Sequence, residues 1–143
     1  MPDAPEAKPS SATNRGFGRV LIVIYAIFAV AATARSGLQI ATKFDQAPVA
    51  YLLSAFAAVV YIVATVALAR DDRTSRRLAT IAITIELFGV LAVGVASLIF
   101  PAEFPAASVW SRFGIGYALI PLVLPMVGLW WLRRTRSPQI RTR

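Results

Sequence analysis

The sequence of 143 residues contains no cysteine and no histidine, and only 15% of its residues are charged. The absence of both residue types excludes disulfide scaffolds, Cys- or His-ligated zinc sites and histidine-ligated haem, because each needs ligands that this chain lacks. It also excludes catalytic sets built on a histidine base or a cysteine nucleophile. The sequence shows no glycine-rich phosphate loop and no pair of acidic residues inside one apolar stretch. We therefore expect no catalytic residues, no metal, no cofactor and no enzymatic activity.

Hydrophobic residues are abundant instead, at 57% of the chain. Soluble globular domains have roughly 45–50% apolar residues and roughly 25% charged ones. Most of the apolar residues here fall into four stretches, and each approaches the ~20 residues that a helix needs to cross a bilayer. The sequence thus predicts an all-α integral membrane bundle of four transmembrane helices, at about residues 18–41, 48–69, 78–100 and 113–132.

The charged residues gather at the borders of these stretches. We expect a disordered cytoplasmic tail at 1–16, a transmembrane domain at 17–133 and a basic tail at 134–143. The connections are short, so neighbouring helices should be antiparallel. One alternative stays open for the first stretch, because its end at Ala32 to Ala34 imitates the small-residue cleavage site of a secretory signal. Cleavage there would leave three spans.

Lysine and arginine are distributed unevenly between the two sides of the predicted membrane. Twelve of the 15 fall in the two tails and the second connection, whereas only Arg35, Lys43 and Arg112 fall on the other side. By the positive-inside rule, both termini should be cytoplasmic. This distribution also accounts for most of the net charge of +8, so we expect no nucleic-acid binding. The basic C-terminal tail is a candidate contact for anionic lipid headgroups.

Glu86 is the one acidic residue well inside a predicted span. It lies about 13 Å from the cytoplasmic end by helical rise, where a carboxylate is costly unless it is paired, protonated or turned into the bundle. Tyr61 and Tyr25 have similar depths on their own helices. We therefore predict an intramembrane polar cluster of Glu86, Tyr61 and Tyr25. Three roles stay open: structural glue between helices, a proton- or cation-coupled site, or a contact with a partner subunit.

Arg35 is the second intramembrane charge to consider. It forms an i, i+4 pair with Gln39 and precedes Asp45, which suggests a charged group at the outer interface. If the first helix ends at Ala34, Arg35 lies at that interface. If the helix continues, Arg35 needs a partner, and Asp45 and Glu103 are the candidates.

Two prolines, Pro121 and Pro125, interrupt the fourth stretch. Each removes a helical hydrogen bond and frees a carbonyl group. We expect a plain kink, which neighbouring helices tolerate in membranes. The alternative is that the freed carbonyls line a ligand or ion path.

The segment Ala34-Arg35-Ser36-Gly37, followed by Ala41 to Asp45 and then Ala47-Pro48, resembles a group of small four-span actinobacterial integral membrane proteins of unassigned function. The preference for arginine over lysine and the abundance of alanine and valine are typical of a high-GC bacterial genome. The resemblance implies a multi-pass protein of the bacterial plasma membrane and carries over no site residues.

These observations favour a non-enzymatic membrane protein that acts through helix–helix contacts, either as an accessory subunit of a membrane-protein partner or as a homo-oligomer. The alternative is a small proton- or cation-coupled transporter or channel subunit that uses Glu86.

Overall fold

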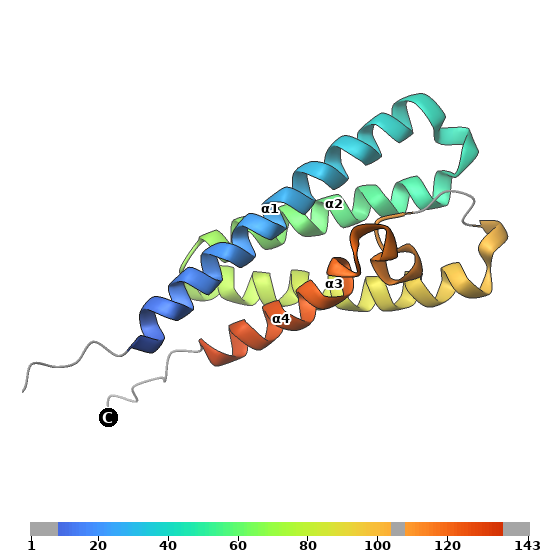
Figure 1. The fold of residues 1–143 in the computed structure, drawn as a ribbon. Coiled ribbons are helices and arrows are strands. Elements are labelled where there is room, and N and C mark those ends of the chain that lie inside the picture. Colours follow the sequence, from blue (N-terminus) through green and yellow to red (C-terminus); the bar gives the residue numbers. More distant parts are fainter. Residues whose placement is uncertain (1–8, 104–107, 136–143) are drawn as a thin grey trace, which may run out of the picture.

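The computed structural model describes residues 9–103 and 108–135, and every regular element in these ranges is helical. The α-helices of these ranges, four in number, lie side by side (Figure 1). Their bounds are α1 (Pro9–Lys43), α2 (Pro48–Ala69), α3 (Arg73–Ile99) and α4 (Ile120–Arg134). Short 3₁₀ segments lie between them, namely η1 (Phe44–Gln46), η2 (Pro101–Glu103) and η3 (Ser111–Tyr117).

The first three helices form two successive hairpins with short turns. Pro48 begins α2, where its fixed φ and missing N–H suit the first turn of a helix. Asp72 caps α3, because its side chain accepts a hydrogen bond from the backbone N–H of Ser75 at 3.2 Å. The start of α1, the end of α4 and the α2–α3 turn lie at the same end of the bundle (Figure 1). Part of the predicted tail, residues 9–16, is helical, and residues 1–8 and 136–143 lie outside the described residues.

The chain does not return from α3 as one continuous helix. Residues 111–117 form 3₁₀ turns that are bent by 98° from α4. The α4 helix therefore contains 15 residues and spans roughly 22 Å, less than the ~30 Å of a bilayer core. The structure thus differs from the single helix predicted for 113–132. Three of its helices are long and apolar enough to cross a membrane, and a fourth span exists only if the bent pair counts as one.

Backbone conformation explains this break. Arg112, Phe113, Ala118 and Leu119 all have positive φ, as does Gly114. An α-helix cannot continue through left-handed residues, so α4 begins only after Leu119. Apolar composition alone did not reveal this, because Phe113, Ala118 and Leu119 are as apolar as the residues that continue the helix.

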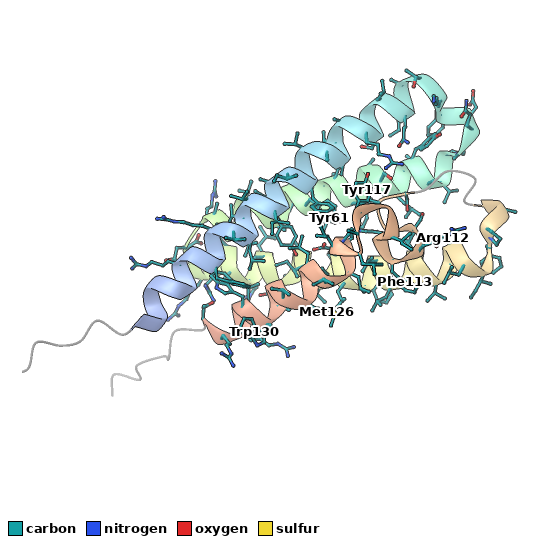
Figure 2. All side chains as sticks on the ribbon, in the orientation of Figure 1. Tyr61, Arg112, Phe113, Tyr117, Met126 and Trp130 are labelled. Atoms are coloured by element: carbon teal, nitrogen blue, oxygen red, sulfur yellow. The ribbon has the colours of Figure 1, made fainter. Side chains whose placement is uncertain are left out.

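Small residues fill the centre of the bundle, and large aliphatic residues cover its outside. Phe88 is 74% exposed and Val30 is 71% exposed, and Met126 and Trp130 lie on the outer side of α4 (Figure 2). Fully or almost fully buried positions are mostly small: Ala32, Ala50, Ala57, Ala58, Ala64, Ala67, Ala79 and Ala82. Small residues let helix backbones approach closely, as in membrane bundles. This distribution is consistent with a membrane-embedded protein.

Candidate functional site

Glu86 lies at the midpoint of α3, about 20 Å by helical rise from either end. Its side chain has no solvent exposure. The Tyr25 hydroxyl donates a hydrogen bond of 2.7 Å to Glu86 Oε2. The second carboxyl oxygen, Oε1, is buried and has no hydrogen-bond partner among the described residues. The site is therefore a single buried carboxyl group that is half satisfied.

Small residues of α3 and α4 lie near this contact. Ala82 and Ala79 lie one and two turns before Glu86 on α3, and both are buried. On α4, a Cβ added to Gly128 would lie 3.5 Å from the Tyr25 hydroxyl oxygen and 3.2 Å from an Ile83 methyl carbon. A larger residue at this position would therefore press on Ile83, whereas its contact with the Tyr25 phenol would be an ordinary one.

Tyr61 lies beside Tyr25, with 6.2 Å between their ring centroids. The structure thus brings together the three residues of the predicted polar cluster. The hydrogen bond that Tyr61 makes is to Trp110, however, whose indole N–H donates to the Tyr61 hydroxyl at 3.0 Å. Tyr61 is linked to Glu86 through the ring of Tyr25 rather than through a hydrogen bond of its own.

Trp110 is a member of this site that the sequence did not suggest. Beside Arg112, at the end of an apolar stretch, it has the signature of a residue at the membrane interface. It is instead buried, with 2% exposure, and packs against Gly89. A Cβ added to Gly89 would lie 2.5 Å from the Trp110 ring, so only glycine permits this contact. In the sequence, only Gly89, one turn after Glu86, indicates that a large side chain packs against α3 here. It does not identify that side chain as Trp110.

Arg35 lies on α1, which continues past it to Lys43. The Arg35 guanidinium donates a hydrogen bond of 2.5 Å to the Tyr117 hydroxyl and lies 5.7 Å from the centre of that ring. Tyr117 in turn contacts Phe28, which contacts Tyr61. Arg35 is therefore connected to the buried cluster by a row of aromatic rings.

The structure describes the side chains of two other residues considered for this region, Asp45 and Gln39. Asp45 is exposed in η1. Gln39 is half-buried, and its Oε1 atom has no hydrogen-bond partner among the described residues. The side chain of Glu103 lies outside the part of the chain that is described. The described contact of Arg35 is thus with a tyrosine hydroxyl, which sequence reasoning did not consider.

The two prolines have different positions in α4. Pro121 occupies the first turn, so it does not interrupt the helix as predicted. Its ring packs against Gly114, where an added Cβ would lie 2.6 Å away. Pro125 lies inside α4 and is buried. Pro121 therefore helps to define where α4 begins, and only Pro125 removes a hydrogen bond within the helix.

At the basic end of the bundle, Arg76 of α3 holds the last turn of α4. Its guanidinium donates to the carbonyl oxygen of Leu132 at 3.2 Å and to the Thr135 hydroxyl at 2.6 Å. A cation at a helix C-terminus also interacts favourably with the helix dipole. Nearby, hydrogen bonds from Ser75 hold the pKa of the Asp72 carboxyl below its usual value. These contacts cap the start of α3 and attach it to the last turn of α4.

The described residues contain no group of three or more Asp, Glu, His or Cys side chains placed to hold a metal ion. The arrangement around Glu86 can instead hold a proton or form a hydrogen bond between helices. Comparisons with protein-family models, with curated proteins and with solved structures find no match for this chain. Any functional proposal must therefore come from the site and the surface themselves.

Proposed function

We propose that this chain is a non-enzymatic integral membrane protein of the bacterial plasma membrane, which acts through helix–helix contacts as an accessory subunit or a homo-oligomer. The observation that carries this proposal is the distribution of side chains, with large aliphatic residues outside and alanine, serine, tyrosine and glutamate inside. In water such a surface would be a severe aggregation liability, because monomeric soluble proteins rarely expose large apolar patches. In lipid it is the expected surface.

The bent segment before α4 is compatible with a membrane location if it forms the outer half of a discontinuous fourth span. Irregular backbone is tolerated at membrane depth only where protein or water satisfies its polar groups. Here Ser108 and Ser111 exchange hydrogen bonds between their side chains and backbone N–H groups. The N–H of Arg112 donates to the Ser97 hydroxyl of α3 at 2.8 Å. These bonds support a four-element membrane bundle with one discontinuous span.

Charge supports an orientation with both termini in the cytoplasm. The α2–α3 turn, with Arg70, Arg73, Arg76 and Arg77, lies at the same end of the bundle as Arg133 and Arg134 of α4 (Figure 1). This end would face the cytoplasm by the positive-inside rule. The exposed arginines there, with the C-terminal tail, would contact anionic lipid headgroups.

A topology experiment tests the membrane part of the proposal directly. The chain has no native cysteine, so single cysteines can be introduced without a background. Asp45→Cys, in η1, should react with a membrane-impermeant maleimide in intact cells. The matched variant Asp71→Cys should react only after lysis. Equal reaction of both variants in intact cells, or recovery of the chain in the soluble fraction, would contradict the proposal.

The helix-contact role requires a second experiment. Extraction of native membranes into lipid nanodiscs, followed by affinity purification and mass measurement, should yield either a defined homo-oligomer or one stoichiometric partner. A monomer without any protein partner would contradict this role. The resemblance to small actinobacterial membrane proteins makes an actinobacterial membrane the natural place to begin.

A second candidate function is a proton- or cation-coupled transporter or channel subunit. The specific observation in its favour is the position of Glu86 at the midpoint of α3, beside a broken helix, since transporter sites often combine these features. Purified protein in liposomes should then show a pH-driven flux that Glu86→Gln abolishes. An equal leak from liposomes with the wild type and the variant would exclude this function.

A further inference from the structure

The surroundings of Glu86 contain too few hydrogen-bond donors for a charged carboxylate. A buried carboxylate is stabilised by opposite charge or by two or three donors. Here Tyr25 is the donor that the structure provides, and Oε1 has no partner among the described residues. A neutral carboxylic acid needs less: its carbonyl oxygen accepts the bond from Tyr25, and its proton resides on Oε1.

The elements packed around Glu86 present tyrosines rather than charges. The titratable groups that face the site are Tyr25 from α1 and Tyr61 from α2, with Tyr117 behind Tyr61. Arg35 of α1 donates a hydrogen bond to the Tyr117 hydroxyl. The described charges of α3 and α4, apart from Glu86 itself, lie at the basic end of the bundle. The hydrogen bond from Tyr25 is thus the one described contact that favours the ionised form, and no described cation supports it.

Trp110 closes the site from the side of the broken helix. Its ring packs on Gly89, one turn from Glu86, and its indole N–H is bonded to Tyr61. Phe56 meets the same ring edge-on at 6.0 Å. Removal of this ring would open a path from the bent segment toward Glu86.

We propose that Glu86 is a proton-binding site at the centre of the bundle, held as the neutral acid with Tyr25 as its positioning residue and Trp110 as its cover. This inference goes beyond the helix-contact role. It depends on the buried site alone and holds for an accessory subunit and for a transporter alike.

Infrared spectroscopy of the full chain in lipid bilayers at neutral pH tests the proposal. The wild type should show the C=O stretch of a protonated carboxyl group, and Glu86→Gln should lose it. The other six acidic residues lie in the N-terminal region and the connections, where they should be ionised. The matched control Asp45→Asn should therefore keep the band. Absence of the band in the wild type, or its persistence in Glu86→Gln, would overturn the proposal. Loss of a carboxylate band in Glu86→Gln would show a charged group paired with a cation, which also overturns it.

A second pair of measurements keeps Glu86 in place and so does not depend on the stability of the first variant. Tyr25→Phe should shift the C=O band to higher frequency, because the carbonyl loses its hydrogen bond. In D₂O, Trp110→Ala should speed the deuteration of the band at least tenfold, whereas Trp110→Phe should change the rate much less. An unshifted C=O band in Tyr25→Phe would show that Tyr25 does not position Glu86. Equal deuteration rates in the wild type and Trp110→Ala would show that Trp110 does not shield it.

Discussion

The hydroxyl of Tyr25 and the carboxyl group of Glu86 are 61 positions apart in the chain, yet they share a buried hydrogen bond of 2.7 Å between α1 and α3. Neither side chain has any solvent exposure. The bond therefore connects two helices that are not consecutive in the sequence. It links α1 and α3 at the centre of the bundle.

The first prediction concerns the cost of removing the hydroxyl groups at this site. Tyr25→Phe leaves Glu86 without its donor and should lower the free energy of unfolding by about 1–3 kcal/mol. Tyr61→Phe, the comparison variant, leaves the buried indole N–H of Trp110 without its acceptor and should also cost about 1–3 kcal/mol. Reversible denaturation in bicelles measures both. A Tyr25→Phe variant as stable as the wild type would show that the bond contributes nothing.

Replacement of both partners should cost less than the sum of the two single changes. In Tyr25→Phe with Glu86→Met, no polar group is left buried and unsatisfied, and such replacements can be nearly neutral. The quantity to measure is the coupling free energy in the double-mutant cycle, which we expect at 0.5–3 kcal/mol in the stabilising direction. Strict additivity would mean that the two side chains do not interact.

The second prediction concerns the close approach of Trp110 to α3. Gly89→Ala places a methyl group where the indole ring lies, so Trp110 should be displaced and the bundle destabilised by about 1–3 kcal/mol. Gly37→Ala is the matched control, because Gly37 is exposed on α1 and has nothing within 4 Å of an added Cβ. It should stabilise the helix by about 0.5–1 kcal/mol. Tryptophan fluorescence and denaturation report the two effects, and equal behaviour of the two variants would refute the packing.

The third prediction tests backbone strain at the start of α4. Ala118 has a φ of 55°, a conformation that costs an L-residue roughly 1–2 kcal/mol. Ala118→Gly should therefore raise the free energy of unfolding by about 1 kcal/mol. Ala41→Gly, at an exposed position in α1, should lower it by about the same amount. Destabilisation by both glycines would show that residue 118 is helical in solution.

The fourth prediction concerns Arg35 and Tyr117, which hold the bent segment against α1. Tyr117→Leu removes both the hydrogen bond and the ring under the guanidinium, whereas Tyr117→Phe keeps the ring. Val109 lies just before this segment and is buried, so a cysteine introduced there (Val109→Cys) reports on opening of the segment. In this background, Tyr117→Leu should raise the rate of maleimide labelling of the cysteine about tenfold, which corresponds to ~1.4 kcal/mol. Tyr117→Phe should raise it less. Unchanged labelling in both variants would separate Tyr117 from the position of the segment.

The fifth prediction is a pH dependence at the start of α3. Because the pKa of Asp72 is lowered in the folded protein, its stabilising contribution is complete above the ordinary carboxyl pKa and is lost as pH falls through the lowered value. Asp72→Ala should lower the melting temperature at neutral pH and flatten this acid dependence. Asp72→Ser should keep the cap and flatten the dependence alone. Melting temperatures measured at several acidic pH values distinguish these variants. If the melting temperature of both variants fell with pH as steeply as that of the wild type, Asp72 would be excluded as the group responsible.

Tyr25 and Tyr61 could be predicted to lie near Glu86 because the position of a residue along a helix axis follows from its place in the sequence. A rise of 1.5 Å per residue places Tyr25, Tyr61 and Glu86 at similar heights once three antiparallel helices are assumed. The same arithmetic says nothing about rotation around each helix axis. It therefore did not show that Tyr25 bonds to Glu86 while Tyr61 accepts from Trp110.

What the sequence determined by itself is the all-helical class and the apolar helices long enough to cross a membrane, because hydropathy and charge position are local properties of the chain. The tertiary structure decided where the fourth apolar stretch stops being helical and which groups meet at the centre. Both depend on contacts between distant segments. Trp110 lies at Gly89 because the chain folds back after α3. Tyr25 bonds to only one oxygen of Glu86, so the other has no partner among the described residues.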